Sequence, residues 1–204
     1  LTATDSAGTS PAAAASFSTP YSTTVTLNVA KSQVTYGGKV KIGGQLVRFL
    51  ASGGAQQISG ATIYVVAKAN AGAKLQIFRQ LTTDSKGDFS ATFAPSANAI
   101  YAAYYAGKVG TAGSPGDLPG ISIFQTINVA PKITITSKPT KSFHLGAFTL
   151  KGKVAPSAKG QKGYLVQVGA LGEHKTLAYV TVGKGSAFTF DESVLGNTVS
   201  YNVQ

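Results

Sequence analysis

Residues 38–46 read GKVKIGGQL, and this stretch decides the fold. Apolar or small residues occupy every second position, which is typical of a β-strand with one buried face. Residues 146–154, GAFTLKGKV, repeat the same pattern 108 residues later. The apolar alternation of residues 25–27 also returns, in residues 133–135. The chain therefore predicts two copies of one β-module.

Length and composition agree with two modules. The chain has 204 residues, enough for two domains of about 100 residues each. Its 24 Gly and frequent Thr, Val, Ser and Tyr favour short strands joined by tight turns. With no Cys, the sequence excludes a disulfide framework and thiolate chemistry. No apolar run approaches the roughly 18 residues of a membrane helix, so we expect no membrane insertion.

Strand-like runs continue after each repeated stretch, and no amphipathic helix of useful length interrupts them. They comprise residues 59–66, 75–81, 89–93, 100–105 and 121–129 in the first copy, and 164–168, 177–182, 188–190 and 199–203 in the second. Residues 107–120, with two prolines, predict a long exposed loop. The runs 177–182 and 188–190 predict a hairpin around residues 183–185. The fold class is therefore predicted as all-β, with two tandem sandwiches.

The two copies have different ends. The first module is predicted over residues 23–131, and the second over residues 132–204. The second copy stops one strand earlier than the first, so it is expected to be incomplete and to lack its last strand. Residues 1–22 form a strand-like extension that belongs to neither copy.

The ordered motifs in both copies resemble the bacterial Ig-like domains that occur in tandem in large exported and cell-surface proteins. In the first copy they are 34–40 (VTYGGKV, with Gly38), 59–63 (SGATI) and 83–89 (TDSKGDF). In the second copy the motif is 145–152 (LGAFTLKG, with Gly146). The resemblance implies two Ig-like β-sandwiches that act as a spacer, stalk or adhesive module. It implies an extracellular or cell-surface location and no enzymatic activity.

Three residues have structural roles in this interpretation. Gly87 is expected in the left-handed position of a bulged hairpin turn, where a Cβ atom would be penalised. Tyr101 and Tyr201 each begin a late strand after a loop. They look like tyrosine-corner residues, which are buried and tie the loop back through their hydroxyl groups.

The extension is a candidate donor strand. Leu1 and Ala3 stand where the family would end a late strand and turn, and Ala13, Ala15 and Phe17 then alternate as a last strand should. Three interpretations stay open: a chain cropped from a longer array, donation of the segment to another copy, or closure onto the same chain. Donation would build a head-to-tail filament. The expected partners are therefore copies of the chain or neighbouring Ig-like domains.

Searches for chemistry in the sequence give no catalytic, cofactor or metal site. The two His residues, His144 and His174, stand in turns or Gly-flanked loops, and a metal site needs three or four converging ligands. Asp84 and Asp88 bracket a Lys-Gly pair and lack a downstream bidentate Glu, so they predict a turn rather than a calcium loop.

Charge leaves a binding function open. Eighteen Lys and Arg against seven Asp and Glu give a net charge of +11. The cations are mostly Lys and are dispersed, whereas nucleic-acid readers typically cluster Arg with aromatics, so no specific nucleic acid is expected. Tyr101, Tyr104 and Tyr105 could form a sugar-binding surface. The alternatives to a structural module are therefore a module that binds an anionic wall polymer or polysaccharide, or an accessory region of a larger secreted enzyme.

Overall fold

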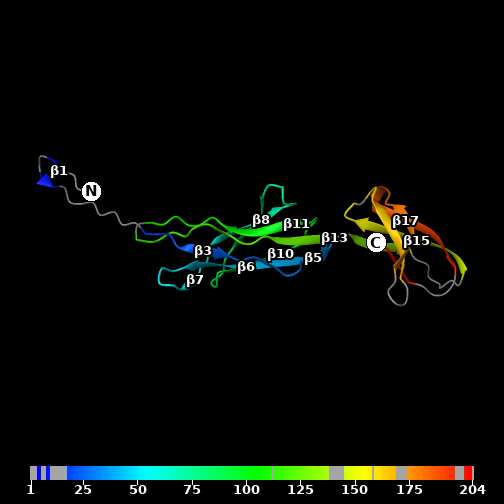
Figure 1. Ribbon diagram of the computed structural model, residues 1–204, viewed down its shortest axis with the longest axis horizontal. Coiled ribbons are helices and arrows are strands. Elements are labelled where there is room, and N and C mark those ends of the chain that lie inside the picture. Colours follow the sequence, from blue (N-terminus) through cyan, green and yellow to red (C-terminus); the bar gives the residue numbers. More distant parts are fainter. Residues whose placement is uncertain are drawn as a thin grey trace. The chain divides into compact units, whose positions relative to one another are not determined.

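The computed structural model confirms an all-β protein (Figure 1). It describes residues 4–5, 8–9, 18–111, 113–137, 145–157, 159–168, 174–195 and 200–203. Apart from one 3₁₀ turn, η1 (Lys184–Ser186), the regular elements in these ranges are strands. No helix in the described ranges is long and apolar enough to cross a membrane.

The chain forms two compact units. The first contains the described parts of Leu1–Ser32, Val40–Phe93 and Asn98–Ile127, and the second those of Gln33–Lys39, Ala94–Ala97 and Asn128–Gln204. Near the start of the chain, β1 (Thr4–Asp5) pairs with β2 (Gly8–Thr9). The donor-strand candidates Leu1, Ala3, Ala13, Ala15 and Phe17 lie outside the described residues.

The first unit is a sandwich of two sheets. One sheet has the order β10-β6-β3, and β4 and β7 also pair with β6. It contains β3 (Ser22–Val25), β4 (Asn28–Val29), β6 (Val40–Phe49), β7 (Ala55–Gln57) and β10 (Asp88–Phe93). The other sheet has the order β13-β11-β8-β9, and β12 also pairs with β11. It contains β8 (Thr62–Lys68), β9 (Gln76–Thr82), β11 (Ala99–Tyr105), β12 (Gly120–Ile121) and β13 (Gln125–Ala130).

The second unit repeats this arrangement in two three-stranded sheets. One has the order β14-β15-β18, and the other β17-β16-β19. They contain β14 (Lys132–Ser137), β15 (Leu145–Ala155), β16 (Lys162–Val168), β17 (His174–Thr181), β18 (Ala187–Leu195) and β19 (Ser200–Val203). Also within this unit, β5 (Gln33–Thr35) pairs in parallel with the Asn128–Ala130 end of β13. The last described strand, β19, forms one edge of its sheet.

Alternating side chains form the two cores, as the period of two predicts. In the first unit Val40, Ile42 and Leu46 of β6 are buried. They face buried residues of the opposite sheet, among them Ile63, Val65, Tyr101 and Ile127. In the second unit the core cluster consists of Phe148, Leu150, Leu165, Phe188 and Phe190.

Three loop predictions need correction. Strands β17 and β18 do not form a hairpin, because they belong to different sheets and η1 connects them. Gly87 has the expected left-handed conformation, with φ of 74°, but its turn also joins two sheets and is not a hairpin. Residues 107–120 are not simply an exposed loop, because part of this segment is paired and buried.

Gly38 lies just before β6, and Gly146 is the second residue of β15. The Gly38 amide donates to the Thr35 carbonyl oxygen at 2.8 Å, which closes the turn before β6. Gly146 lies in β15 opposite Val194 of β18. Both positions therefore precede the core residues of their strands, as the repeat predicts.

Candidate binding site in the first unit

The segment after β11 folds back on itself as a narrow ribbon. Lys108 and Asp117 exchange backbone hydrogen bonds of 2.8 and 2.9 Å, and Thr111 and Ser114 form a second such pair nearer the tip. The local pairing resembles a short antiparallel ladder. The ribbon therefore holds Asp117 at a defined position.

Contacts to the start of β3 fix the ribbon to the sandwich. The Tyr21 amide donates to the Gly116 carbonyl oxygen at 2.9 Å, and the Leu118 amide donates to the Tyr21 carbonyl oxygen at 2.9 Å. The Thr23 hydroxyl donates to the Leu118 carbonyl oxygen at 2.8 Å. These bonds satisfy ribbon groups on both sides of Asp117 and direct its carboxylate into the unit.

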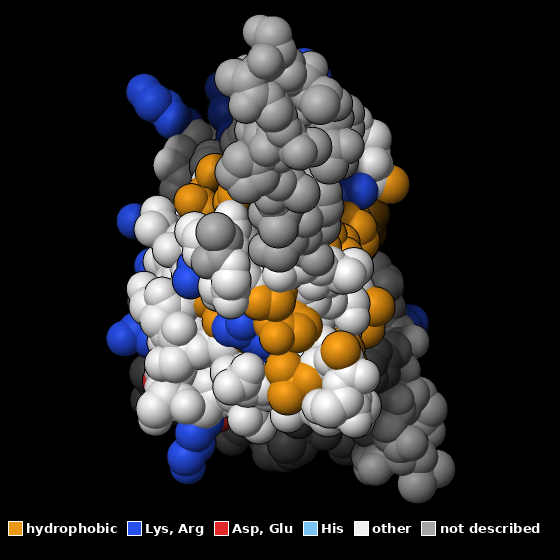
Figure 2. Space-filling model, turned by 90° about the vertical axis from the view of Figure 1, so that its left-hand side faces the viewer, with side chains coloured by type: hydrophobic (Ala, Val, Ile, Leu, Met, Phe, Trp, Pro, Cys, Tyr) orange, Lys and Arg blue, Asp and Glu red, His pale blue; other side chains and the backbone are white. Residues whose placement is uncertain are grey.

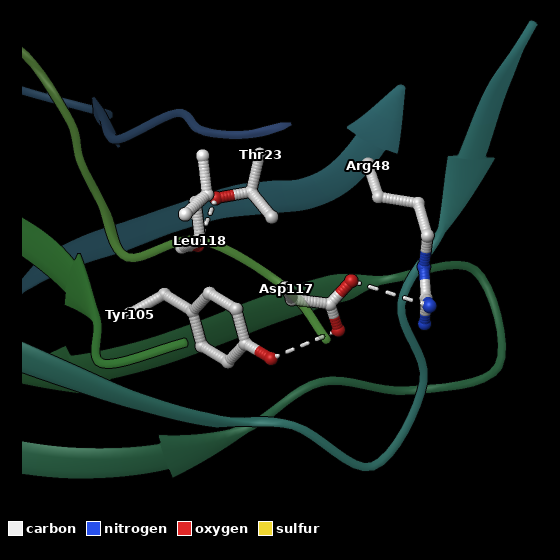
Figure 3. A network of polar contacts seen from close by, with 5 residues as sticks. All are labelled: Thr23, Arg48, Tyr105, Asp117 and Leu118. Carbon is white, nitrogen blue, oxygen red and sulfur yellow. Dashed lines mark hydrogen bonds and ion pairs between the residues drawn. The ribbon is translucent and has the colours of Figure 1, made fainter. Parts of the chain in front are cut away.

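The Asp117 carboxylate contacts two strands at once (Figure 3). Its Oδ1 atom lies 3.2 Å from Nη1 of Arg48 on β6, and its Oδ2 atom accepts a 3.3 Å hydrogen bond from the hydroxyl of Tyr105 on β11. The Asp117 side chain is 1% exposed and that of Arg48 23%. A buried carboxylate requires such partners, because an unpaired charge in this environment is strongly unfavourable.

Arg48 forms the outer part of the cluster. Its guanidinium carbon lies 5.5 Å from the centre of the Tyr21 ring, within cation–π range. Its Nε atom is buried and has no hydrogen-bond partner within the described ranges. Arg48 therefore joins the ribbon to β6, while its buried Nε donor has no partner among the described residues.

The cluster changes the acidity of Tyr105. Burial is the main cause that raises the pKa of its phenol from 10.0 to about 12, and the charge of Asp117 and the hydrogen bond to it act in the same direction. The positive charge of Arg48 lowers the pKa and offsets part of the effect. Tyr105 therefore stays protonated, and a donor to Asp117, throughout the physiological range.

A cavity of about 430 Å³ adjoins the cluster. The lining residues are Arg48, Tyr64, Tyr105, Lys108 and Asp117, together with the 58–62 segment. This volume falls in the usual range for small-molecule sites, roughly 300–1,000 Å³. A second cavity of about 640 Å³ lies along the ribbon and shares residues 106–108 and Asp117 with the first.

Thr83 fixes the wall formed by the 58–62 segment. Its buried hydroxyl donates to the Ile58 carbonyl oxygen at 2.7 Å and accepts from the Ala61 amide at 2.9 Å. The Gly60 amide donates to the Thr83 carbonyl oxygen at 2.9 Å. The wall is therefore hydrogen-bonded to Thr83, the residue that follows β9.

The tyrosines singled out in the sequence have different environments. Tyr101 is 4% exposed, and its ring centre lies 5.5 Å from that of Phe78 and 5.4 Å from that of Phe93. Burial raises the pKa of its phenol. No hydrogen bond among the described residues involves its hydroxyl, so the predicted corner bond is not part of these contacts. Tyr201 pairs through its backbone with Gln167, and its side chain lies outside the described residues.

The predicted sugar-binding cluster Tyr101, Tyr104 and Tyr105 is not a common surface. Tyr101 and Tyr105 face the core, whereas Tyr104 points to the other side of the sheet and lies 6.5 Å from Tyr64 between ring centres. Strand alternation explains the split, because neighbouring residues face opposite sides.

The acidic turn at Asp84 belongs to no metal-binding cluster in the described part of the chain. The Asp84 Oδ1 atom accepts from the amides of Lys86 at 2.8 Å and Asp88 at 3.0 Å, which is the predicted turn role. Within the described ranges no group of three His, Cys, Asp or Glu side chains could hold a metal ion. His144 and the side chain of His174 lie outside those ranges.

The sequence interpretation missed Arg48 and Asp117. Arg48 continues the inward-facing positions of residues 40–46, and a cation at such a position demands an acidic partner. Asp117 is one of only seven acids in the chain. Those two facts together are a usable signal, but the Gly and Pro residues of 107–120 predict an exposed loop and hide it.

Comparisons with known proteins add little to this geometry. No protein-family model matches the chain, and no curated protein matches its sequence. Among solved structures, it is similar to the crystal structure of a tetra-tandem repeat in the extending region of a large adhesion protein. The TM-score is 0.33 and the sequence identity 8%, over 90% of this chain and 48% of that one. The chain thus spans about half the length of that structure.

Proposed function

We propose that the chain is a non-catalytic structural or adhesive module of a bacterial extracellular or cell-surface protein, as part of a stalk, fibre or filament. Two tandem sandwiches with the motifs of Ig-like domains support this proposal.

The finer proposal is head-to-tail assembly by strand addition, and one observation carries it. In the first unit β11 pairs with β8 on one side and with β13 on the other. In the second unit the corresponding strand, β19, pairs with β16, and no described residue pairs with its other edge. A free edge offers unpaired N–H and C=O groups to an incoming strand.

The N-terminal segment of another copy is the proposed incoming strand. In its sequence Ala13, Ala15 and Phe17 alternate with small or polar residues, which suits a strand with one face on a core. Such an edge addition obtains its affinity from main-chain hydrogen bonds and its specificity from alternate side chains. A neighbouring Ig-like domain of a longer chain would satisfy the same edge.

Deletion of residues 1–17 tests this assembly. The deletion ends before Tyr21, because Tyr21 bonds the ribbon of the first unit. We expect sedimentation to show loss of assemblies larger than one chain, and hydrogen exchange to show faster exchange of the β19 amides. Unchanged assembly together with unchanged β19 exchange would rule out donation of this segment.

Single substitutions provide the matched pair. Phe17→Asp places a charge on the proposed core-facing side, and Ser16→Asp places the same charge on the opposite side. Strand addition requires the first variant to lose assembly and the second to retain it. Equal behaviour of the two variants would show that charge, not strand register, controls association.

A further inference from the structure

We propose that the cavity lined by Arg48, Tyr64, Lys108 and Asp117 binds an acidic sugar, a hexuronate unit of an extracellular polysaccharide. The site belongs to the first unit, whereas the β19 edge on which strand addition depends belongs to the second. The two proposals are therefore independent of each other.

The lining offers both kinds of contact that a sugar ring requires. Tyr64 is half-buried on β8 and is one of the residues that line the cavity. An aromatic face can cover the apolar C–H face of a pyranose, while its hydroxyl remains available to polar groups. Ser59 and Thr62, which carry hydroxyl groups, also line the cavity.

Charge favours an acidic ligand over a neutral one. The cavity contains two cations and one carboxylate, and Arg48 already pairs with that carboxylate. Within the described part of the chain Lys108 has no carboxylate within ion-pair distance. Lys and Arg side chains also stand out on the face shown in Figure 2, where almost no acidic side chain is visible. Lys108 is thus available to pair with a ligand carboxylate.

Two of the lining residues, Arg48 and Asp117, have unused hydrogen-bonding capacity. Buried Oδ1 of Asp117 has its ion pair with Arg48 but no hydrogen bond, and buried Nε of Arg48 has no acceptor in the described ranges. A sugar hydroxyl both donates and accepts, so one hydroxyl could serve both atoms. Since both are closed to water in this state, ligand entry requires a shift of the partly exposed Arg48 side chain.

Titration of the full chain with trigalacturonate tests the site, with neutral maltotriose as the control ligand. We expect heat of binding, and shifts of amide resonances in residues 58–64 and 106–117, for the acidic sugar. Tyr64→Ala and Lys108→Ala should each weaken binding about tenfold or more, which corresponds to about 1.4 kcal/mol. Tyr64→Phe should retain binding, because it keeps the ring.

Matched variants separate the site from general surface charge. Tyr164→Ala removes the corresponding tyrosine of the second unit, and Lys74→Ala removes one exposed lysine that does not line the cavity. Both should bind trigalacturonate as the unsubstituted chain does. The proposal is overturned by absence of binding, by equal binding of maltotriose, or by equal losses in Lys74→Ala and Lys108→Ala. The assembly variant Phe17→Asp should still bind trigalacturonate. A failure of the strand-addition proposal can therefore be distinguished from a failure of the binding-site proposal.

Discussion

The two units share one arrangement of strands. They differ in their last strands, because β11 of the first unit pairs on both edges and β19 of the second pairs with described residues on one edge. In each unit a bulge interrupts the pairing at the same place, between Val65 and Val66 in the first and between Leu165 and Val166 in the second. The extra residue is Phe78 in the first unit, where its ring contacts the core aromatics. The arrangement of strands that the two units share therefore includes this bulge.

A close approach of glycine to phenylalanine is also repeated. A Cβ atom at Gly44 would meet the Phe89 ring and the Thr26 carbonyl oxygen, and one at Gly152 would meet the Phe188 ring and the Thr134 carbonyl oxygen. Each glycine lies directly opposite its phenylalanine in the ladder. The glycines of the repeat thus make room for the aromatic cores.

The polar cluster is what the two units do not share. Position 48 is Arg in the first unit, whereas the corresponding position 156 of the second is Pro. The second unit folds into the same pairs of strands without that Arg, so the shared arrangement of strands does not require it. A feature that this arrangement does not require is a better candidate for function than one that both copies contain.

The largest expected effect concerns the cluster. Arg48→Met should destabilise the first unit by about 3 kcal/mol, because it leaves the Asp117 carboxylate buried without its ion pair. Asp117→Asn should cost less, since the Arg48 side chain can reach water. Hydrogen exchange resolved by strand is the suitable measurement, with the β16 amides of the second unit as internal control. A loss spread equally over both units would contradict the assignment.

The second-largest effect, destabilisation by an added Cβ atom beside a core phenylalanine, should be equal in the two units. Gly44→Ala and Gly152→Ala should each destabilise their own unit by about 2 kcal/mol, a typical cost of overpacking. Gly54→Ala is the control, because a Cβ atom there has no neighbour within 4 Å. Denaturant unfolding followed by exchange in each unit measures both effects. If one of the two substitutions does not destabilise its unit, the two cores are packed less alike than the strand pairing indicates.

A pH effect should appear in the first unit. The pKa of Tyr105 is about 12 in the folded chain and near 10.0 when unfolded. The unfolded chain therefore releases the proton first, so this contribution to stability is complete below pH 10 and lost as the pH rises towards 12. Thermal melting of the chain and of Tyr105→Phe over that range measures it. The same pH slope in both proteins would exclude Tyr105 as the cause.

The smallest expected effect compares two tyrosines of β11. Tyr105→Phe should cost about 1 kcal/mol through loss of the hydrogen bond to Asp117. Tyr101→Phe should be nearly neutral, because the ring contacts with Phe78 and Phe93 remain. Melting temperatures of the two variants decide between them. A larger loss of melting temperature for Tyr101→Phe than for Tyr105→Phe would instead support the corner hydrogen bond predicted from the sequence.

Much of the fold could be predicted from the sequence because its signals are local. The alternation in residues 38–46 and 146–154 predicted β6 and β15, and the repeat predicted two sandwiches. The turn at Asp84 and the left-handed Gly87 followed from residue type. Sheet membership did not follow, since a turn between two strands has similar composition whether they pair or cross to another sheet.

The candidate site was less predictable, for a related reason. Arg48, Tyr105 and Asp117 come from three distant parts of the chain and meet only after the sheets have packed. Pro and Gly in residues 107–120 predict a loop, yet its backbone finds partners in Tyr21 and within itself.

The sequence by itself determined the strands, the tandem repeat and the turns, because periodicity and backbone preferences act over a few residues. The tertiary structure decided which strands share a sheet, which edge of β19 has no partner among the described residues, and that Asp117 is buried beside Arg48. Burial of a charge depends on the partner that long-range packing supplies, and no local pattern around Asp117 contains that partner.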